Sequence, residues 1–394
     1  MNKSIHPQEV DVRLRKGIML ILCACMMLTM NVAAQESIKV GFYGPLAGPM
    51  SLSGIASRQG AELAIKQINA QGGVNGQKMV LVAYNDNSSP EEAVKVVTRM
   101  ITADKVHCIV GSLHSGNILA SAPVVEKYKI PEIGIGTSPG WLQKGYTYLF
   151  RPLANTSIIN VQIAKTINDL KYKKVGALGR SDEYGKTGVD DVKKQLDGYG
   201  IKLVAEWFNP GDTDFTGQLT KLLTSNIDAL IAFGVDADQG PIVKQARLNG
   251  FDGLIFGPES LSVPSVKDVA GKDADSSVFG SSYVIPAKPE QALNKMHEDF
   301  FKAFVAEFGR MPDSQTALRT YDSVKIFAEA FKRAKSLDGT AVRDQIANLY
   351  GFEGLAGTFD FRGGNGEGIR ESRMFAIKDG KDILLSEYLK TYKK

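Results

Sequence analysis

Ser138 lies in the segment Gly136-Thr137-Ser138-Pro139-Gly140, which has the G-x-S-x-G spacing of a serine-hydrolase nucleophile. In that chemistry, the backbone N–H of the residue after the serine helps to bind the oxyanion. Here that residue is Pro139, which has no N–H to donate. The spacing is therefore present without the donor that hydrolysis requires, and it argues against an enzyme of this class.

A second motif, between Gly179 and Thr187, resembles a phosphate-binding loop that ends in Gly-Lys-Thr. Five residues separate Gly179 from Gly185, where the loop has four, and Asp182 with Glu183 would repel a phosphate. No pair of His or Cys residues has metal-ligand spacing. We therefore expect no nucleotide, no metal and no other cofactor.

His114 is the remaining residue with catalytic potential, and it lies in the segment Ser112–Asn117. As a general base, His114 would need a nucleophile and an orienting acid, and the sequence identifies neither. We expect it to form part of a pocket wall.

The elements around these segments alternate between short apolar runs and amphipathic helical stretches. Several runs are apolar at every position, as in strands that are covered on both faces, and the rhythm predicts an α/β fold with doubly wound parallel sheets. The expected strands are 38–42, 79–83, 108–111, 175–178, 203–208, 229–233 and 254–256, and two expected helices contain 159–170 and 317–331. Ligands gather at the carboxyl ends of such strands. The loops to search are therefore 43–54, 112–117, 134–141, 180–186, 234–240 and 257–263.

The N-terminus resembles a secretory signal peptide. Arg13, Arg15 and Lys16 precede an apolar run that is too short to span a bilayer, and small residues end at Ala34. We expect cleavage after Ala34. Two alternatives are an uncleaved apolar helix and lipoprotein processing at Cys25, which the odd Cys23 and the short apolar stretch weaken.

Charge and cysteine content narrow the possible partners. The chain has 47 Lys and Arg residues and 43 Asp and Glu residues. Residues 1–34 contain four of the basic and two of the acidic residues, so the rest of the chain has 43 basic and 41 acidic residues and a net charge of +2. This balance excludes a basic nucleic-acid-binding surface. Cys108 is the one cysteine outside residues 1–34, so we expect no internal disulfide and an inert core thiol.

The stretch Gly41–Asn87 resembles the opening of the Leu/Ile/Val-binding protein family. It contains the family's Gly-Pro, a helix ending in Ile-Asn-Ala, and then Gln-Gly-Gly-Val-Asn-Gly. Further matches follow in order at 109–111, 182–185, 214–215, 226–228, 257–259 and 320–322, so the resemblance spans roughly residues 36–380.

The resemblance implies the type I periplasmic binding protein fold, in which two α/β lobes are joined by three chain crossings and enclose a ligand. Lobe 1 would comprise residues 36–156 and 282–370, and lobe 2 residues 157–281 and 371–394.

The resemblance also implies the site residues. Ser115, and Ser138 with the backbone of Gly136, match the positions that hold a ligand carboxylate. Glu259 matches the acceptor of the ammonium group, and Tyr184 the tyrosine that closes over the ligand. This set is chemically sound, because a buried carboxylate needs several hydrogen-bond donors and a buried ammonium needs an ionised acceptor.

Three departures from the family pattern predict a reshaped pocket wall. Ser53 and Val235 stand where branched-chain binders carry tyrosines, and His114 replaces a disulfide-bonded cysteine. Arg319 either reaches the cleft or lies on a solvated helix face; we expect the second, because arginine is usually exposed.

The sequence thus predicts a periplasmic, monomeric receptor that delivers a neutral amino acid, branched-chain, aliphatic or aromatic, to the permease of an ABC importer. One alternative is a receptor for an aromatic or other small carboxylate without an amine. A ligand-sensing regulator on the same fold and an enzyme are further alternatives, which the leader and the lack of a catalytic set disfavour.

Overall fold

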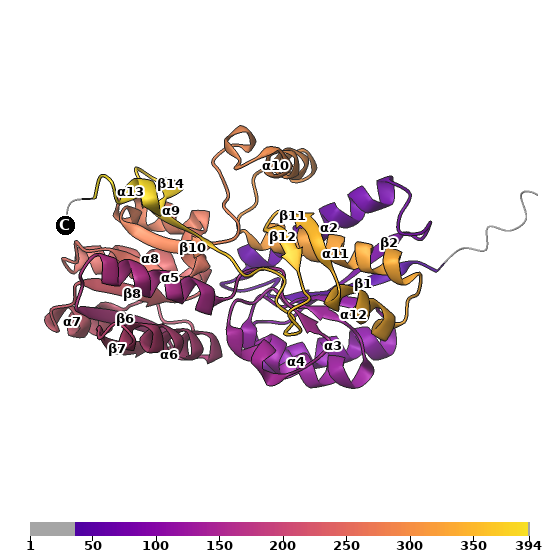
Figure 1. The fold of residues 1–394 in the computed structure, drawn as a ribbon, viewed down its shortest axis with the longest axis horizontal. Helices are drawn as coiled ribbons and strands as arrows, with labels where there is room; N and C mark the ends of the chain where they lie inside the picture. The colour runs from indigo at the N-terminus through magenta and orange to yellow at the C-terminus, as the bar shows by residue number, and fades with distance from the viewer. Residues whose placement is uncertain (1–35, 393–394) are drawn as a thin grey trace, which may run out of the picture. The chain divides into compact units, whose positions relative to one another are not determined.

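The computed structural model describes residues 36–392, whose strands form two large β-sheets and one small hairpin (Figure 1). The expected signal peptide, residues 1–34, lies outside the described residues. Among the residues described, no helix combines the length and the apolar character needed to cross a membrane.

The first sheet has the strand order β2-β1-β3-β4-β5, and all four pairings are parallel. Its strands are β1 (Ile38–Gly44), β2 (Met79–Asn85), β3 (Cys108–Gly111), β4 (Glu132–Ile133) and β5 (Leu149–Phe150). The helices that accompany it are α2 (Ser51–Ala70), α3 (Pro90–Arg99), η1 (Met100–Asp104), α4 (Ser115–Tyr128), η2 (Pro139–Lys144), η5 (Pro289–Gln291), α10 (Lys295–Phe308), α11 (Thr316–Ala334) and α12 (Gly339–Ala347), with the hairpin β11 (Tyr350–Gly354) and β12 (Gly357–Asp360).

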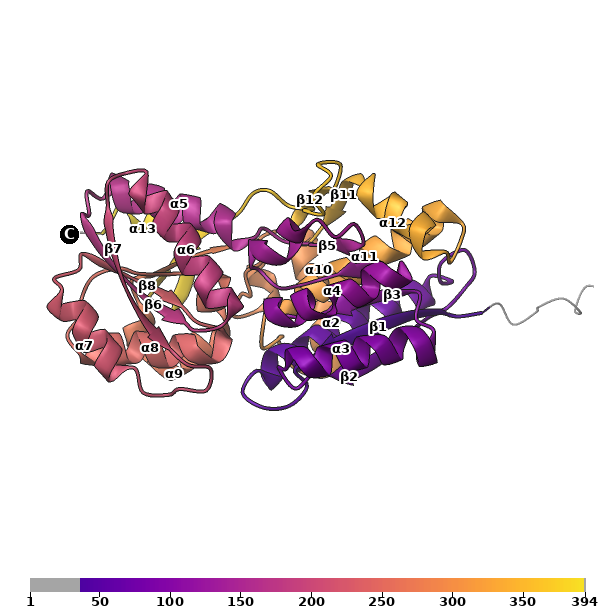
Figure 2. The same ribbon diagram turned by 90° about the horizontal axis from the view of Figure 1, so that it is seen from below.

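Helices cover both faces of this first sheet. Cys108 and Val110 belong to a buried cluster that includes α2 and α11, whereas Ile109 between them packs in the cluster of α3 and α4. Both ribbon views place α3 beside α4 (Figure 2). The continuous apolar run of β3 is explained by this two-sided burial. Cys108 is a buried free thiol whose pKa is raised by burial, which confirms its expected place in the core.

The second sheet has the order β14-β13-β10-β9-β8-β6-β7. Its strands are β6 (Lys174–Arg180), β7 (Lys202–Phe208), β8 (Ala229–Phe233), β9 (Ile255–Gly257), β10 (Ser277–Ser281), β13 (Arg373–Lys378) and β14 (Lys381–Leu384). Its helices are α5 (Thr156–Asp169), α6 (Glu183–Asp197), α7 (Thr216–Thr224), α8 (Asp236–Leu248), η3 (Glu259–Ser262), α9 (Pro264–Ala270), η4 (Gly271–Ala274) and α13 (Leu385–Tyr388).

Alternate residues of β8 face opposite sides of the second sheet. Ala229, Ile231 and Phe233 pack with α5 and α6, whereas Leu230 and Ala232 pack with α7, α8 and α9. The sheet is therefore wound on both faces, as the alternation of apolar runs and helices predicts. It is not wholly parallel, because β13 pairs antiparallel with β10 and with β14.

The chain passes between the two sheet regions three times: between β5 and α5, after β10, and between β12 and β13. This arrangement confirms the expected α/β fold with two sheets and three crossings. Every strand predicted from an apolar run is present. The short strands β4 and β5 and the late strands from β10 onward were not predicted, although β13 contains the apolar run 374–377.

Glu132 in β4 is a buried carboxyl group within the first sheet. Tyr43 donates a hydrogen bond of 2.7 Å to Glu132 Oε1, and the hydroxyl groups of Tyr43 and Ser121 lie 2.9 Å apart. Burial raises the pKa of Glu132 from its usual 4.5 to about 8. The folded chain therefore holds a proton on Glu132 over a pH range in which the unfolded chain has released it.

This pKa shift predicts a pH-dependent stability. The proton on Glu132 favours the folded state fully below pH 4.5, and that contribution is lost as the pH rises toward 8. Glu132→Gln keeps an acceptor for Tyr43 but does not titrate, so its stability relative to the wild type should rise between pH 5 and pH 8, by up to a few kcal/mol. Urea denaturation at both pH values measures the difference. Equal differences at the two pH values, as expected for the exposed control Glu387→Gln, would contradict the proposed proton uptake.

Candidate ligand-binding site

A cavity of about 320 Å³ lies where loops from the two sheet regions meet. Its volume falls in the range of small-molecule pockets. Each of the six loops singled out in the sequence contributes to its wall, as expected for the carboxyl ends of parallel strands. The lining residues are Met50, Ser88, Pro90, Leu113, His114, Ser115, Gly116, Asn117, Thr137, Arg180, Asp182, Glu183, Tyr184, Pro210, Val235, Asp236, Ser260, Thr316 and Arg319.

One wall of the cavity is the first turn of α4, which begins at Ser115. The N-cap residue, His114, makes no side-chain capping bond, and the Ser115 side chain is buried beside the cavity. The hydroxyl of Ser115 accepts a hydrogen bond of 3.2 Å from the backbone N–H of Ser138. Free N–H groups at a helix N-terminus attract anions. This wall is therefore suited to a carboxylate.

The buried carboxylate of Asp86 stabilises the turn before α4 by hydrogen bonds. Asp86 accepts hydrogen bonds from the Ser112 hydroxyl at 2.6 Å and from Asn117 Nδ2 at 2.9 Å. His114 Nε2 lies 3.0 Å from the Ser88 hydroxyl, and both residues line the cavity. Burial lowers the pKa of His114, which favours the neutral imidazole.

The opposite wall comes from the second sheet. Arg180, at the end of β6, forms ion pairs with Asp182 at 2.7 Å and with Asp238 at 3.0 Å. Tyr184, in the first turn of α6, packs edge-on against Phe233 with ring centroids 6.5 Å apart. Tyr184 lines the cavity, and the contact with Phe233 holds its ring there.

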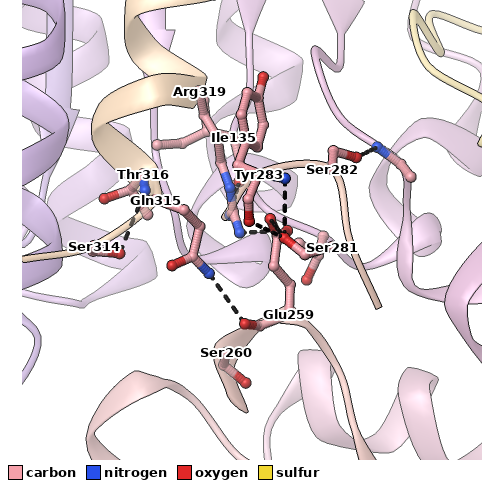
Figure 3. A network of polar contacts seen from close by, with 12 residues as sticks. Ile135, Glu259, Ser260, Ser281, Ser282, Tyr283, Ser314, Gln315, Thr316 and Arg319 are labelled. Atoms are coloured by element: carbon pink, nitrogen blue, oxygen red, sulfur yellow. Dashed lines mark hydrogen bonds and ion pairs between the residues drawn. The ribbon is translucent and has the colours of Figure 1, made fainter. Parts of the chain in front are cut away.

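Glu259 forms a buried ion pair with Arg319 (Figure 3). Arg319 Nη2 donates to Glu259 Oε2 at 2.6 Å, and the Ser281 hydroxyl donates to Oε1 at 2.7 Å. Arg319 Nη1 also donates to the carbonyl of Ile135 at 2.9 Å. Burial raises the pKa of Glu259, whereas Arg319 and Ser281 act to lower it.

The expectation that Arg319 lies on a solvated helix face is wrong. Its exposed fraction is 5%, and every residue of α11 from Thr316 to Val324 is buried. This half of α11 is enclosed on all sides, so helical periodicity alone does not reveal that its charged residues are inside. Figure 3 shows the side chains of Arg319 and Gln315 extending from α11 toward Glu259.

Asp236, the first residue of α8, is a carboxylate that the sequence analysis did not single out. The hydroxyls of Ser53 and Ser314 both hydrogen-bond to its Oδ2 atom, the second at 3.2 Å. Burial raises the pKa of Asp236, and these hydroxyls together with the nearby charge of Arg319 act to lower it. Asp236 directly follows Val235 in the loop 234–240, where the sequence analysis expected ligand-binding residues. Its place in the sequence could therefore have identified it as a candidate.

Glu183 faces Ser138 across the cavity wall. The Ser138 hydroxyl donates to Glu183 Oε1 at 2.7 Å and accepts from the N–H of Gly140 at 3.2 Å. Thr187 adds a hydrogen bond to the same carboxylate oxygen at 3.2 Å. Ser138 therefore joins segments from the two sheet regions.

The structure brings only some of the predicted site residues to the cavity surface. His114, Ser115, Tyr184 and Val235 line it. The other four predicted residues are buried and contact residues that line the cavity. Ser53 contacts Asp236, and Gly136 lies beside Ser115. Ser138 contacts Glu183, and Glu259 contacts Arg319.

Comparisons with known proteins identify similar chains. A family model described as "Periplasmic binding protein" matches residues 37–382. The leucine-, isoleucine-, valine-, threonine-, and alanine-binding protein of Pseudomonas aeruginosa is 30% identical over 322 residues, which are 80% of this chain and 84% of that relative.

Two solved structures share the fold. A branched-chain amino acid transporter substrate-binding protein from Streptococcus pneumoniae, in complex with isoleucine, has a TM-score of 0.77 at 28% identity and covers 88% of this chain and 98% of its own. A leucine-binding protein from Thermotoga maritima has a TM-score of 0.80 at 24% identity, over 88% and 97% of the two chains. These similarities confirm the fold expected from the sequence.

The Arg319–Glu259 pair predicts a large effect on stability. Arg319→Met leaves Glu259 buried without its cation and should destabilise the fold by about 3–5 kcal/mol, whereas Arg319→Met combined with Glu259→Leu should recover most of that loss. The matched control is Arg333→Met in the same helix, where the partly exposed pair with Glu329 contributes about 1 kcal/mol or less. Thermal and urea denaturation measure all three. Equal destabilisation by Arg319→Met and Arg333→Met would contradict the buried pair.

Proposed function

Because this chain belongs to the periplasmic binding protein family and has the type I fold, we propose that it is the solute-binding receptor of an ABC importer. We infer that it binds a neutral amino acid, branched-chain, aliphatic or aromatic. The observation that carries the proposal is the cavity itself, whose wall contains the uncapped first turn of α4 from the first sheet region and the acidic residues Asp182, Glu183 and Asp236 from the second. Those two features complement the two charges of an amino acid.

In the proposed complex, the ligand carboxylate is held at the first turn of α4. The Ser115 hydroxyl and the N–H groups beside it donate hydrogen bonds, and Thr137 adds a hydroxyl from the loop after β4. Gly136 is required beside this site, because a Cβ at that position would lie 2.9 Å from the Ser115 hydroxyl oxygen. Ser138 positions the loop rather than contacting the ligand. Tyr184 covers the ligand from the second sheet.

The ligand would bridge two lobes and favour their closed arrangement. We propose the lobe boundaries expected from the sequence, with 36–156 and 282–370 in lobe 1 and 157–281 and 371–394 in lobe 2. They are supported by the partition of buried clusters, since the clusters around each sheet draw on these separate ranges. The closed receptor would present its ligand to the permease as a monomer.

A specific observation favours the second candidate, a receptor for a carboxylate without an amine. Glu259, the expected acceptor of the ammonium group, already has a cationic partner in Arg319. If no other carboxylate took its place, the cavity would lack an acceptor for an amine. Asp236 is the residue on which the choice between the two ligand classes depends.

Loss of the Ser115 hydroxyl tests the carboxylate site. Ser115→Ala removes a hydrogen bond to a charged group, a contribution of about 1.5–3 kcal/mol, so the affinity for an amino acid should fall roughly tenfold to a hundredfold. Titration calorimetry with L-leucine and L-phenylalanine measures the change. Ser121→Ala is the matched control, because Ser121 is in the same helix and bonds Tyr43 instead of lining the cavity. If Ser115→Ala and Ser121→Ala bound alike, Ser115 would not be a ligand residue.

Export to the periplasm gives a separate expected outcome. Signal peptidase should cleave after Ala34, so the mature protein should begin at Gln35. N-terminal sequencing of the protein from a periplasmic fraction decides the point. A lipid-modified start at Cys25, or an intact Met1, would contradict it.

A further inference from the structure

Two carboxylates, the buried Glu259 and the partly exposed Asp236, are candidate acceptors for a ligand ammonium group. Both follow strands of the second sheet, Glu259 after β9 and Asp236 after β8. They differ in what they already contact and in whether they reach the cavity. The choice between them therefore decides how the site recognises a cation.

Glu259 is occupied on both carboxylate oxygens. Arg319 takes Oε2 and Ser281 takes Oε1, and the residue is 1% exposed. Its backbone carbonyl is also occupied, by Gln315 Nε2 at 3.1 Å. A second cation brought to Glu259 would have to displace Arg319 or lie beside its charge, and both are costly in a buried site.

Asp236 has the opposite properties. It lines the cavity, and its two side-chain hydrogen bonds come from neutral hydroxyls that both approach Oδ2. Within residues 36–392, Asp236 takes part in no ion pair. As the first residue of α8, its carboxylate is also favoured by the helix N-terminus. It is a carboxylate at the cavity surface that lies near the charge of Arg319 but has no ion-pair partner in direct contact.

Arg319 and Ser115 supply hydrogen-bond donors for the carboxylate of the ligand. Arg319 bonds the carbonyl of Ile135, and Ser115 lies against Gly136, so Arg319 and Ser115 approach the same loop after β4. Arg319 lines the cavity, and its buried Nε has no acceptor within the described residues. A ligand carboxylate between Ser115 and Arg319 would meet donors from both.

We propose that Asp236, and not Glu259, accepts the ammonium group of the ligand, and that Glu259 acts as a positioning residue that holds Arg319 at the cavity. This assignment rests on the proposed amino-acid receptor function and specifies its determinant. It replaces the role that Glu259 has by resemblance. Ser53 thereby acquires a function too, since its hydroxyl supports the Asp236 carboxylate from the first sheet region.

The test compares each amino acid with the same molecule lacking its amine. The probes are L-leucine with 4-methylpentanoate and L-phenylalanine with 3-phenylpropanoate, titrated calorimetrically into the wild type, Asp236→Asn, Asp236→Ser and Glu259→Gln. The ratio of the two affinities within one variant reports amine recognition, and binding of the amine-free probe shows that the variant is folded. Asp190→Asn, an exposed position in α6, controls for the change in overall charge.

In the wild type, the amino acid should bind more tightly than its amine-free analogue. Both Asp236 variants should lose affinity for the amino acid by roughly thirtyfold or more while binding the analogue within a few-fold of the wild type. Glu259→Gln should keep most of the preference for the amine and should bind the analogue more tightly, because Arg319 then lacks its countercharge.

The results that would contradict the proposal distinguish the assignment to Asp236 from the amino-acid receptor function. If the wild type binds the amino acids preferentially, but Glu259→Gln abolishes that preference and Asp236→Asn retains it, Glu259 is the acceptor and the assignment to Asp236 is overturned alone. If the wild type binds neither amino acid, or binds both members of each pair equally, the amino-acid receptor function fails and the assignment fails with it.

Discussion

The buried ion pair between Arg319 and Glu259 is the constraint on which the rest of the site depends. A guanidinium and a carboxylate with exposed fractions of 5% and 1% are tolerated together, because each satisfies the charge of the other. The pair joins α11 to the end of β9 and so links the two sheet regions across the cavity. It also occupies the carboxylate expected to bind the ligand. Among residues 36–392, two cavity-lining acids form no ion pair, and of these Glu183 accepts hydrogen bonds from Ser138 and Thr187, which leaves Asp236 as the candidate acceptor.

The fold explains why these groups meet. Parallel strands in both sheets end at the cavity, so loops far apart in the chain deliver an uncapped helix turn from one side and acidic helix starts from the other. The two sides are connected by short polar contacts such as Ser138 to Glu183 and Ser53 to Asp236. In the proposed complex, a zwitterion would add its own charges to this set of contacts, so ligand binding and a closed arrangement would favour one another.

The sequence predicted the parts of this account that depend on local patterns. Continuous apolar runs identified the central strands, and the family motifs brought attention to Ser115 and Tyr184. It failed where the environment is set by distant segments. Arg319 was misplaced because α11 is enclosed by packing that helical periodicity does not encode, and Asp236 was overlooked although its neighbour Val235 was chosen. The strands β4 and β5 are two residues each, too short to leave a pattern.

The most direct test of the receptor function is equilibrium dialysis of protein stripped of endogenous ligand by unfolding and refolding. The protein is dialysed against a mixture of the protein amino acids and their amine-free aliphatic and aromatic analogues, and the retained compounds are quantified by mass spectrometry. We expect the protein to retain one or more neutral amino acids in a stoichiometric amount and none of the amine-free analogues. Retention of the amine-free carboxylates alone, or of no compound by correctly refolded protein, would contradict it.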